Sequence, residues 1–459
     1  MNRTKSTPAM RVMDMTQGSP AKLILAFAVP LFIGNIFQQI YSMVDTAVAG
    51  YCLGDGAIAA IGATSSLYAF LIDFASGLNS GCAIVVTQHF GARDEKKLKS
   101  AIAGMIELDA VVTLALSLVF LRPLMRFMNT PEGIFEQAHQ YIAVICAGMA
   151  ATIAYNMFSG ILRAFGNSRT SLFFLMISSV LNMGMDLLFV AVLGMGVAGA
   201  ALATVIAQGV SALLCGVYVF RHYKAFLPGK EDFRVSGSLI AELLSNGIAM
   251  ALMYCVVDLG SVIFQRANNH LGETIISAHT ASRRIIGIMM QPLATIATAS
   301  STFVGQNWGA GKPERIHTAL RRVTAMEIGW SLFGCGLVFA FGGALVRLTT
   351  GTSDTEVVRN AVMSLRWHLS FFPALGCLLA LRTAMQAMGQ KTAPILSSCI
   401  ELGMKLLSAA LLIPRLGFFG TSITEPITWS LMLLFLAAAY FGSKTRMFST
   451  MATEKGAME

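Results

Sequence analysis

Twelve long apolar stretches, separated by short polar or Gly- and Pro-containing segments, dominate the sequence. Several are well above the ~20 residues that an α-helix needs to cross a hydrocarbon layer of ~30 Å. Backbone N–H and C=O groups find no partner in lipid, so such stretches are expected to be helical. We therefore expect an all-α membrane protein with twelve transmembrane helices. The predicted spans are about 23–51, 56–86, 100–121, 134–162, 170–193, 196–220, 239–265, 274–304, 318–346, 356–387, 392–414 and 418–442.

Charge supports this class and orients the chain. Charged residues make up only 12% of the sequence, against ~25% in soluble domains. Loops on one side of the predicted spans hold 23 Lys and Arg residues, and loops on the other side hold six. Because cytoplasmic loops carry the basic excess, we expect both termini to be cytoplasmic. The net charge of +9 reflects the same bias, and no nucleic-acid partner is expected.

The sequence holds no motif for a cofactor or for covalent catalysis. The eight cysteines are scattered singly, with no Cys-x-x-Cys and no ligand-like spacing to histidine. Motifs of nucleotide-binding loops, zinc peptidases and serine hydrolases are absent. An intramembrane enzyme is the alternative from another class, but no histidine has a convincing partner in the sequence. We expect no cofactor and no enzymatic activity, so an ion gradient must drive any uphill transport.

The chain repeats itself. Three short segments of the first half recur in the same order in the second half, at offsets of 218 to 223 residues. Six predicted spans separate the copies, which predicts two pseudo-symmetric six-helix lobes around a central cavity. The pairs are 53–60 with 271–278, 88–97 with 306–315, and 163–166 with 386–389. The expected parts are an N-terminal segment 1–20, a lobe 21–220, a cytoplasmic linker 221–238, a lobe 239–442 and a cytoplasmic tail 443–459.

Four polar residues lie inside the spans of the first half at similar depth. Asp45, Asp186 and Thr204 are each predicted roughly 9–12 Å below the outer surface, at 1.5 Å per helical residue. Asn182 lies one turn from Asp186 on the same helix face. A charge inside a span is costly unless it is protonated, paired or wetted, so a functional site is the default interpretation. The four suit a sodium ion, and the two carboxylates suit a proton; interhelical hydrogen bonding is the structural alternative.

These residues belong to a wider set of motifs that resembles the multidrug and toxic compound extrusion (MATE) family, closest to its DinF-like bacterial branch. The motifs follow the family's order along nearly the whole chain. The resemblance implies a multi-pass transporter in the bacterial plasma membrane that exports organic cations in exchange for protons or sodium. The matching segments are 43–50 with Leu53-Gly54, 88–91, 162–166, Asn182-x-x-x-Asp186, 196–204 and 305–310.

In the resembling family, positions such as Gln38 and Asn156 line the central cavity and contact the drug. Tyr41 and Met157 add an aromatic ring and a thioether, which suit a site that accepts many ligands. Interhelical hydrogen bonding is the alternative role for Gln38 and Asn156. The expected partners are cationic amphipathic drugs and the lipid bilayer, and the protein is expected to be a monomer.

The second half does not copy the acidic site of the first. The repeat places Lys405 opposite Asn182, and Glu401 and Lys405 have the i, i+4 spacing that favours an ion pair. Glu425 falls close to the counterpart of Thr204. We expect these three residues to form a neutralised structural cluster, with a second coupling site as the alternative.

The sequence therefore predicts a secondary antiporter that works by alternating access. A lipid-linked oligosaccharide flippase of the wider superfamily is the alternative transporter, although such proteins tend to have additional spans and a strongly cationic groove. Here the leading constellation inside the spans is acidic.

Overall fold

The computed structural model describes residues 13–53, 55–117, 121–127, 132–352 and 354–456. Every regular element within these ranges is a helix. The chain divides into two compact units, which we name by their position in the sequence. The N-terminal unit comprises Met1–Met15 and Val29–Ala251, and the C-terminal unit comprises Thr16–Ala28 and Leu252–Glu459.

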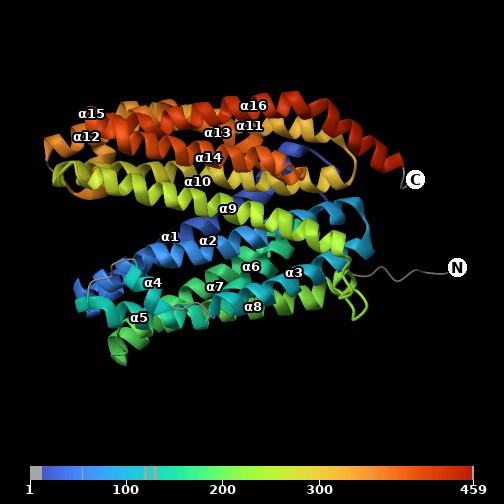
Figure 1. Cartoon of the computed structure of the whole chain (residues 1–459), viewed down its shortest axis with the longest axis horizontal. Coiled ribbons are helices and arrows are strands. Elements are labelled where there is room, and N and C mark those ends of the chain that lie inside the picture. The colour runs from blue at the N-terminus through green and yellow to red at the C-terminus, as the bar shows by residue number, and fades with distance from the viewer. Residues whose placement is uncertain (1–12, 54, 118–120, 128–131, 353, 457–459) are drawn as a thin grey trace. The chain divides into compact units, whose positions relative to one another are not determined.

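Two long helices contribute to both units. The unit boundaries fall inside α1 (Pro20–Leu53) and α9 (Gly237–Asn269). The other helices of the N-terminal unit, followed by colour in Figure 1, are α2 (Asp55–Ala92), α3 (Glu95–Ser117), α4 (Leu121–Phe127), α5 (Glu132–Ala147), α6 (Met149–Ala164), α7 (Ser168–Asp186), the π-helix η1 (Leu187–Val192), α8 (Gly196–His222) and the 3₁₀-helix η2 (Lys224–Phe226).

The other helices of the C-terminal unit are mostly long and run side by side in Figure 1. They are α10 (Glu273–Gly309), α11 (Pro313–Thr350), α12 (Thr355–Ser370), α13 (Phe372–Ala387), α14 (Thr392–Leu407), the π-helix η3 (Ser408–Leu412), α15 (Ile413–Leu416) and α16 (Phe418–Gly456).

The helices have the length and hydropathy of membrane spans. Within the described residues, nine helices are long and apolar enough to cross a membrane, or up to eleven if each of two bent pairs counts as one span. The predicted third span, 100–121, extends past the end of α3 at Ser117 into residues 118–120, which lie outside the described residues. The predicted class, an all-α multi-span membrane protein, is confirmed.

Two predicted spans are bent in the middle. α5 and α6 meet at 46° around Gly148, and α12 and α13 meet at 47° around Phe371. Pro373 lies in the first turn of α13. Proline has no N–H to donate and its ring clashes with the carbonyl four residues earlier, so the bend follows from the sequence.

Close helix packing in the N-terminal unit depends on small residues, as the spacing Gly77-x-x-x-Gly81 predicts. A Cβ at Gly77 would lie 2.6 Å from the Ala251 Cα, and Gly81 packs in the same way against the backbone of Asn246. Both contacts are made to α9, so only glycine allows α2 and α9 to approach this closely.

Candidate ion-binding site

α7 has its polar side chains inside and its apolar side chains outside. The helix begins after Asn167, whose side chain accepts a hydrogen bond of 3.1 Å from the Thr170 N–H. Its buried face carries Ser171, Ser178, Ser179, Asn182 and Asp186. Its exposed face carries Phe173, Ile177 and Val180. This distribution suits a helix with lipid on one side, and it directs the polar face toward the interior of the N-terminal unit.

Asp186 and Asn182 are in direct contact on this buried face. Asp186 is the last residue of α7 and is fully buried, and Asn182 is 1% exposed. With the amide oriented to satisfy its neighbours, the Asn182 nitrogen donates to Asp186 Oδ2 over 2.9 Å. The Asn182 oxygen then accepts the Thr204 backbone N–H over 3.1 Å. The predicted constellation is therefore assembled for these three residues.

Thr204 links this contact to α1. Its hydroxyl donates to the Ala200 carbonyl within α8 over 3.2 Å and lies 3.5 Å from the Tyr41 hydroxyl. The site thus draws on α1, α7 and α8, and it includes Tyr41, which the sequence placed in the drug cavity.

Asp45 lies in α1, but its side chain is outside the described residues. Its neighbours on the same helix face are Tyr41, one turn earlier, and Val48, about one turn later. Val48 is buried against Val190 of η1 and Ala200 of α8. α1 therefore contacts η1 and α8 through Val48, and it contacts α8 through Tyr41 and Thr204.

A π-helix follows Asp186 directly. η1 covers Leu187–Val192, and the C-terminal unit has its own π-helix, η3, directly after α14. π-helical turns are rare and occur often at functional sites. No spacing rule applied to the sequence predicts them, so this part of the site is found only in the structure.

The remaining predicted cavity residues differ in environment. Gln38 is exposed on α1. Asn156 donates to the Ser76 hydroxyl over 3.1 Å, which is the interhelical hydrogen bond that the sequence left as its alternative role. Met157 is 7% exposed and lies in a hydrophobic core with Leu78 and Ile161.

The Glu401–Lys405 ion pair that the sequence spacing predicts is present. Lys405 Nζ lies 2.8 Å from Glu401 Oε1 and donates to the Ser261 hydroxyl of α9 over 3.1 Å. The Lys405 side chain is 5% exposed, so the pair is buried. Within the described residues, no three His, Cys, Asp or Glu side chains are grouped to hold a metal ion.

Glu425 has partners that the sequence reasoning missed. Arg283 Nη1 donates to both of its carboxylate oxygens over 2.7 Å, and His368 Nε2 lies 3.2 Å from Oε2. One signal was available, because an arginine inside a span needs an acidic partner. The sequence could not show which acid, since the three residues come from α10, α12 and α16.

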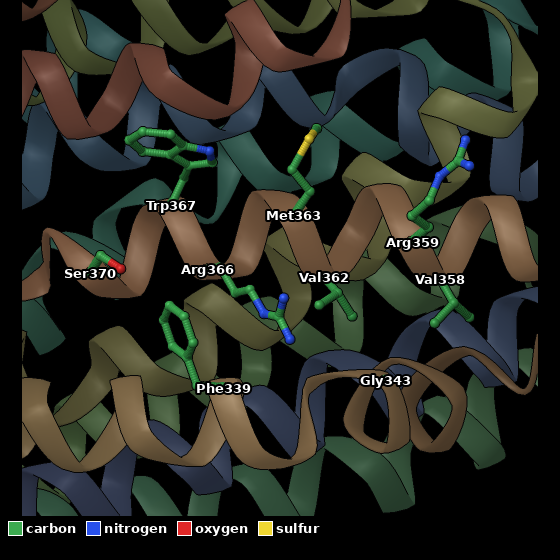
Figure 2. A pocket seen from close by; sticks show the side chains of 9 residues that line it. All are labelled: Phe339, Gly343, Val358, Arg359, Val362, Met363, Arg366, Trp367 and Ser370. Atoms are coloured by element: carbon green, nitrogen blue, oxygen red, sulfur yellow. The ribbon is translucent and has the colours of Figure 1, made fainter.

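A groove of about 770 Å³ lies elsewhere in the C-terminal unit, along α11 and α12 (Figure 2). Its lining is mostly apolar, with Arg359 and Arg366 as the charged members. The Arg366 guanidinium lies 5.3 Å from the centre of the Phe339 ring. Among the predicted site residues whose side chains the structure describes, none lines this groove.

Comparison with known proteins places the chain in a family. The model of the MatE family matches residues 30–188 and again 249–411. The chain is 29% identical over 383 residues to a protein named probable multidrug resistance protein YpnP, from Bacillus subtilis, covering 83% of this chain and 85% of the relative. It is 23% identical to the multidrug export protein MepA of Staphylococcus aureus, covering 90% of both chains.

Solved structures show the same fold. One described as MATE in the bent conformation has a TM-score of 0.86 at 20% identity, covering 96% of this chain and 98% of that one. Another, described as the outward-facing conformation of a multidrug resistance MATE family transporter, has a TM-score of 0.86 at 21% identity, covering 97% and 99%. At these identities the likeness concerns the fold.

Proposed function

Because the chain belongs to the MatE family of membrane transporters, and so is a transporter and not an enzyme, we propose that it exports cationic drugs in exchange for H+ or Na+. The similarity to proteins named for multidrug resistance and multidrug export supports the substrate class. The observation that carries the coupling is Asp186, fully buried inside a span and hydrogen-bonded to Asn182.

The mechanism follows from the cost of a buried carboxylate. An ionised acid inside a span is stabilised when a cation or a proton neutralises it. In the proposed cycle, H+ or Na+ enters the Asp45–Asp186 site from outside and displaces the drug. The ion then leaves toward the cytoplasm, and a new drug molecule binds. The positions of Tyr41 and Val48 support the participation of Asp45 in this site.

Other parts of the proposal come from the sequence. Gln38, Tyr41, Asn156 and Met157 are proposed to contact the drug. The proposed location is the bacterial plasma membrane, with both termini cytoplasmic, and the proposed branch of the family is the DinF-like one. The proposed linker between the lobes is 221–238.

The test is efflux of a fluorescent organic cation from proteoliposomes under separately imposed pH and sodium gradients. One of the two gradients should drive efflux by the wild type, and Asp45→Asn and Asp186→Asn should abolish the driven part. Glu231→Gln, in the exposed linker, is the matched control and should behave as the wild type. Wild-type driven efflux in both mutants, or no response to either gradient, would end the proposal.

A further inference from the structure

Three helices of the C-terminal unit meet at a cluster of charged groups, in which Glu425 and His368 are buried and the Arg283 side chain is 45% exposed. Glu425 of α16 is 8% exposed and His368 of α12 is 4% exposed. Arg283 of α10 holds both carboxylate oxygens of Glu425 over 2.7 Å, and His368 Nε2 lies 3.2 Å from Oε2. The antiport mechanism described above does not use these groups.

The hydrogen bonds of His368 require two protons on its ring. Nδ1 lies 2.8 Å from the backbone carbonyl oxygen of Ser364, which can only accept, so Nδ1 carries a hydrogen. A neutral imidazole then has no hydrogen on Nε2. Nε2 nevertheless faces a carboxylate oxygen at hydrogen-bond distance. A second proton must therefore lie between Nε2 and the Glu425 carboxylate.

Arg283 decides where that proton lies. Its guanidinium binds both oxygens of Glu425, which favours the ionised carboxylate. The shared proton is therefore on the imidazole, and His368 is an imidazolium ion paired with Glu425. We infer that the His368–Glu425 pair is a second proton-binding site of this transporter, separate from Asp186.

The charge balance of the cluster allows this proton to leave. With the proton bound, Arg283 and His368 face one carboxylate. Without it, Arg283 still neutralises Glu425, so no buried acid is left without a partner. The charged and titratable groups that interact electrostatically with His368 or with its partner Glu425 are His279 and Arg283 of α10 and Lys405 of α14.

Loss of the proton also changes a contact between helices. In the neutral ring, a lone pair on Nε2 would face the lone pairs of Glu425 Oε2 across 3.2 Å. That arrangement is repulsive, so loss of the proton weakens the α12–α16 contact. Proton binding and the packing of α12 against α16 are therefore linked. A contribution of this change to coupling rests on the antiport proposed above. The binding of a proton by His368 does not depend on that proposal.

Trp429 reports on His368 independently of transport. The two rings lie 5.8 Å apart at an interplanar angle of 73°, and an imidazolium ion quenches indole fluorescence more strongly than neutral imidazole does. A variant of the full chain with Trp308→Phe, Trp330→Phe and Trp367→Phe keeps Trp429 as its only tryptophan. Its emission is titrated with pH in detergent.

We expect a single one-proton transition in Trp429 emission. It should be lost in His368→Gln and retained in His279→Gln, which removes a second histidine of the same cluster. Emission that does not change with pH, or a transition that persists in His368→Gln, would overturn the inference. If the single-tryptophan variant does not fold, NMR of ¹⁵N-labelled histidine in the wild type and in His368→Gln provides the same test. The wild type should show an imidazolium signal that is missing from the variant. A wild-type spectrum without such a signal would overturn the inference.

The coupling role has its own readout. In proteoliposomes, His368→Gln should show a shallower dependence of efflux rate on the imposed pH gradient than the wild type and His279→Gln. An unchanged dependence would refute a role of this proton in coupling. If the wild type shows no driven efflux at all, the antiport proposal fails, while the fluorescence titration still decides whether His368 binds a proton.

Discussion

The two units contain corresponding helices that end in the same unusual way but carry different charges. α7 runs into the π-helix η1, and α14 runs into the π-helix η3. On α7, Asp186 accepts a hydrogen bond from the amide of Asn182. On α14, Lys405 occupies the position that the repeat aligns with Asn182, and it forms an ion pair with Glu401.

This difference shows two ways to bury a charge inside a membrane protein. An ion pair is neutral without further ligands, so α14 can keep it permanently. An amide donates a hydrogen bond but brings no charge of its own, so it supports a carboxylate that changes its protonation or binds an ion. We therefore propose that Asp186 on α7 takes part in coupling and that the Glu401–Lys405 pair on α14 has a structural role.

The largest expected effect separates the two helices by function. Asp186→Asn should remove the ion-driven drug gradient. For one exchanged proton, that gradient is about tenfold in concentration, or about 1.4 kcal/mol, for each pH unit across the membrane. The measurement is the steady-state drug gradient in proteoliposomes. The double variant Glu401→Gln/Lys405→Met, which removes charge from α14, should keep the gradient. Equal losses in both variants would break the comparison.

The next effect concerns stability. Lys405→Met alone leaves Glu401 buried without its partner and should cost about 3 kcal/mol of unfolding free energy. The double variant with Glu401→Gln should recover most of that loss, as measured by chemical unfolding in detergent. Arg359→Ala, which breaks an exposed ion pair with Glu356, should change stability by less than about 1 kcal/mol. A Lys405→Met protein as stable as the wild type would refute a structural role for the pair.

A smaller effect is expected from the amide on α7. Asn182→Ala removes a hydrogen bond to a charged group, and such bonds contribute ~1.5–3 kcal/mol, so the apparent affinity for the driving ion should change by roughly tenfold to a hundredfold. The measurement is the ion concentration that gives half-maximal efflux.

Asn79 provides the matched control for Asn182. It donates to Asp109 Oδ1 over 3.0 Å and so forms another buried Asn–Asp contact in the N-terminal unit. Asn79→Ala should leave the ion dependence unchanged. The same shift in both variants would mean that the contact at Asp186 has no special role.

The smallest effect is expected at the edge of the site. Tyr41→Phe removes the hydroxyl that lies 3.5 Å from the Thr204 hydroxyl. A neutral hydrogen bond contributes ~0.5–1.5 kcal/mol, and this one is long, so the affinity for the ion should fall by no more than about fivefold. A loss as large as that of Asp186→Asn would show that Tyr41 belongs to the centre of the site.

The sequence predicts the parts of this protein that depend on local pattern. Apolar length predicts the spans, Pro373 predicts the bend before α13, and the spacing of Glu401 and Lys405 predicts their ion pair. The contact of Asn182 with Asp186 also follows from helical spacing. Each of these predictions needs only residues within one helix.

Features that depend on contacts between helices could not be predicted in the same way. The pairing of Glu425 with Arg283 and His368 joins residues that are far apart in the sequence. The sequence places Thr204 in the predicted site because of its estimated depth in the membrane. The hydrogen bond from its backbone N–H to Asn182 depends on the packing of α8 against α7, which the sequence does not show. No sequence pattern predicts the two π-helices.

The most direct test of the account is to measure what the protein releases when a drug binds. Purified wild-type protein in weakly buffered detergent solution should release H+, followed with a pH indicator, or Na+, followed with radioactive sodium, on addition of tetraphenylphosphonium. Asp186→Asn should bind the probe without releasing either ion. Release of the same amount of the same ion by Asp186→Asn and wild type would contradict the claim that Asp186 holds the coupling ion.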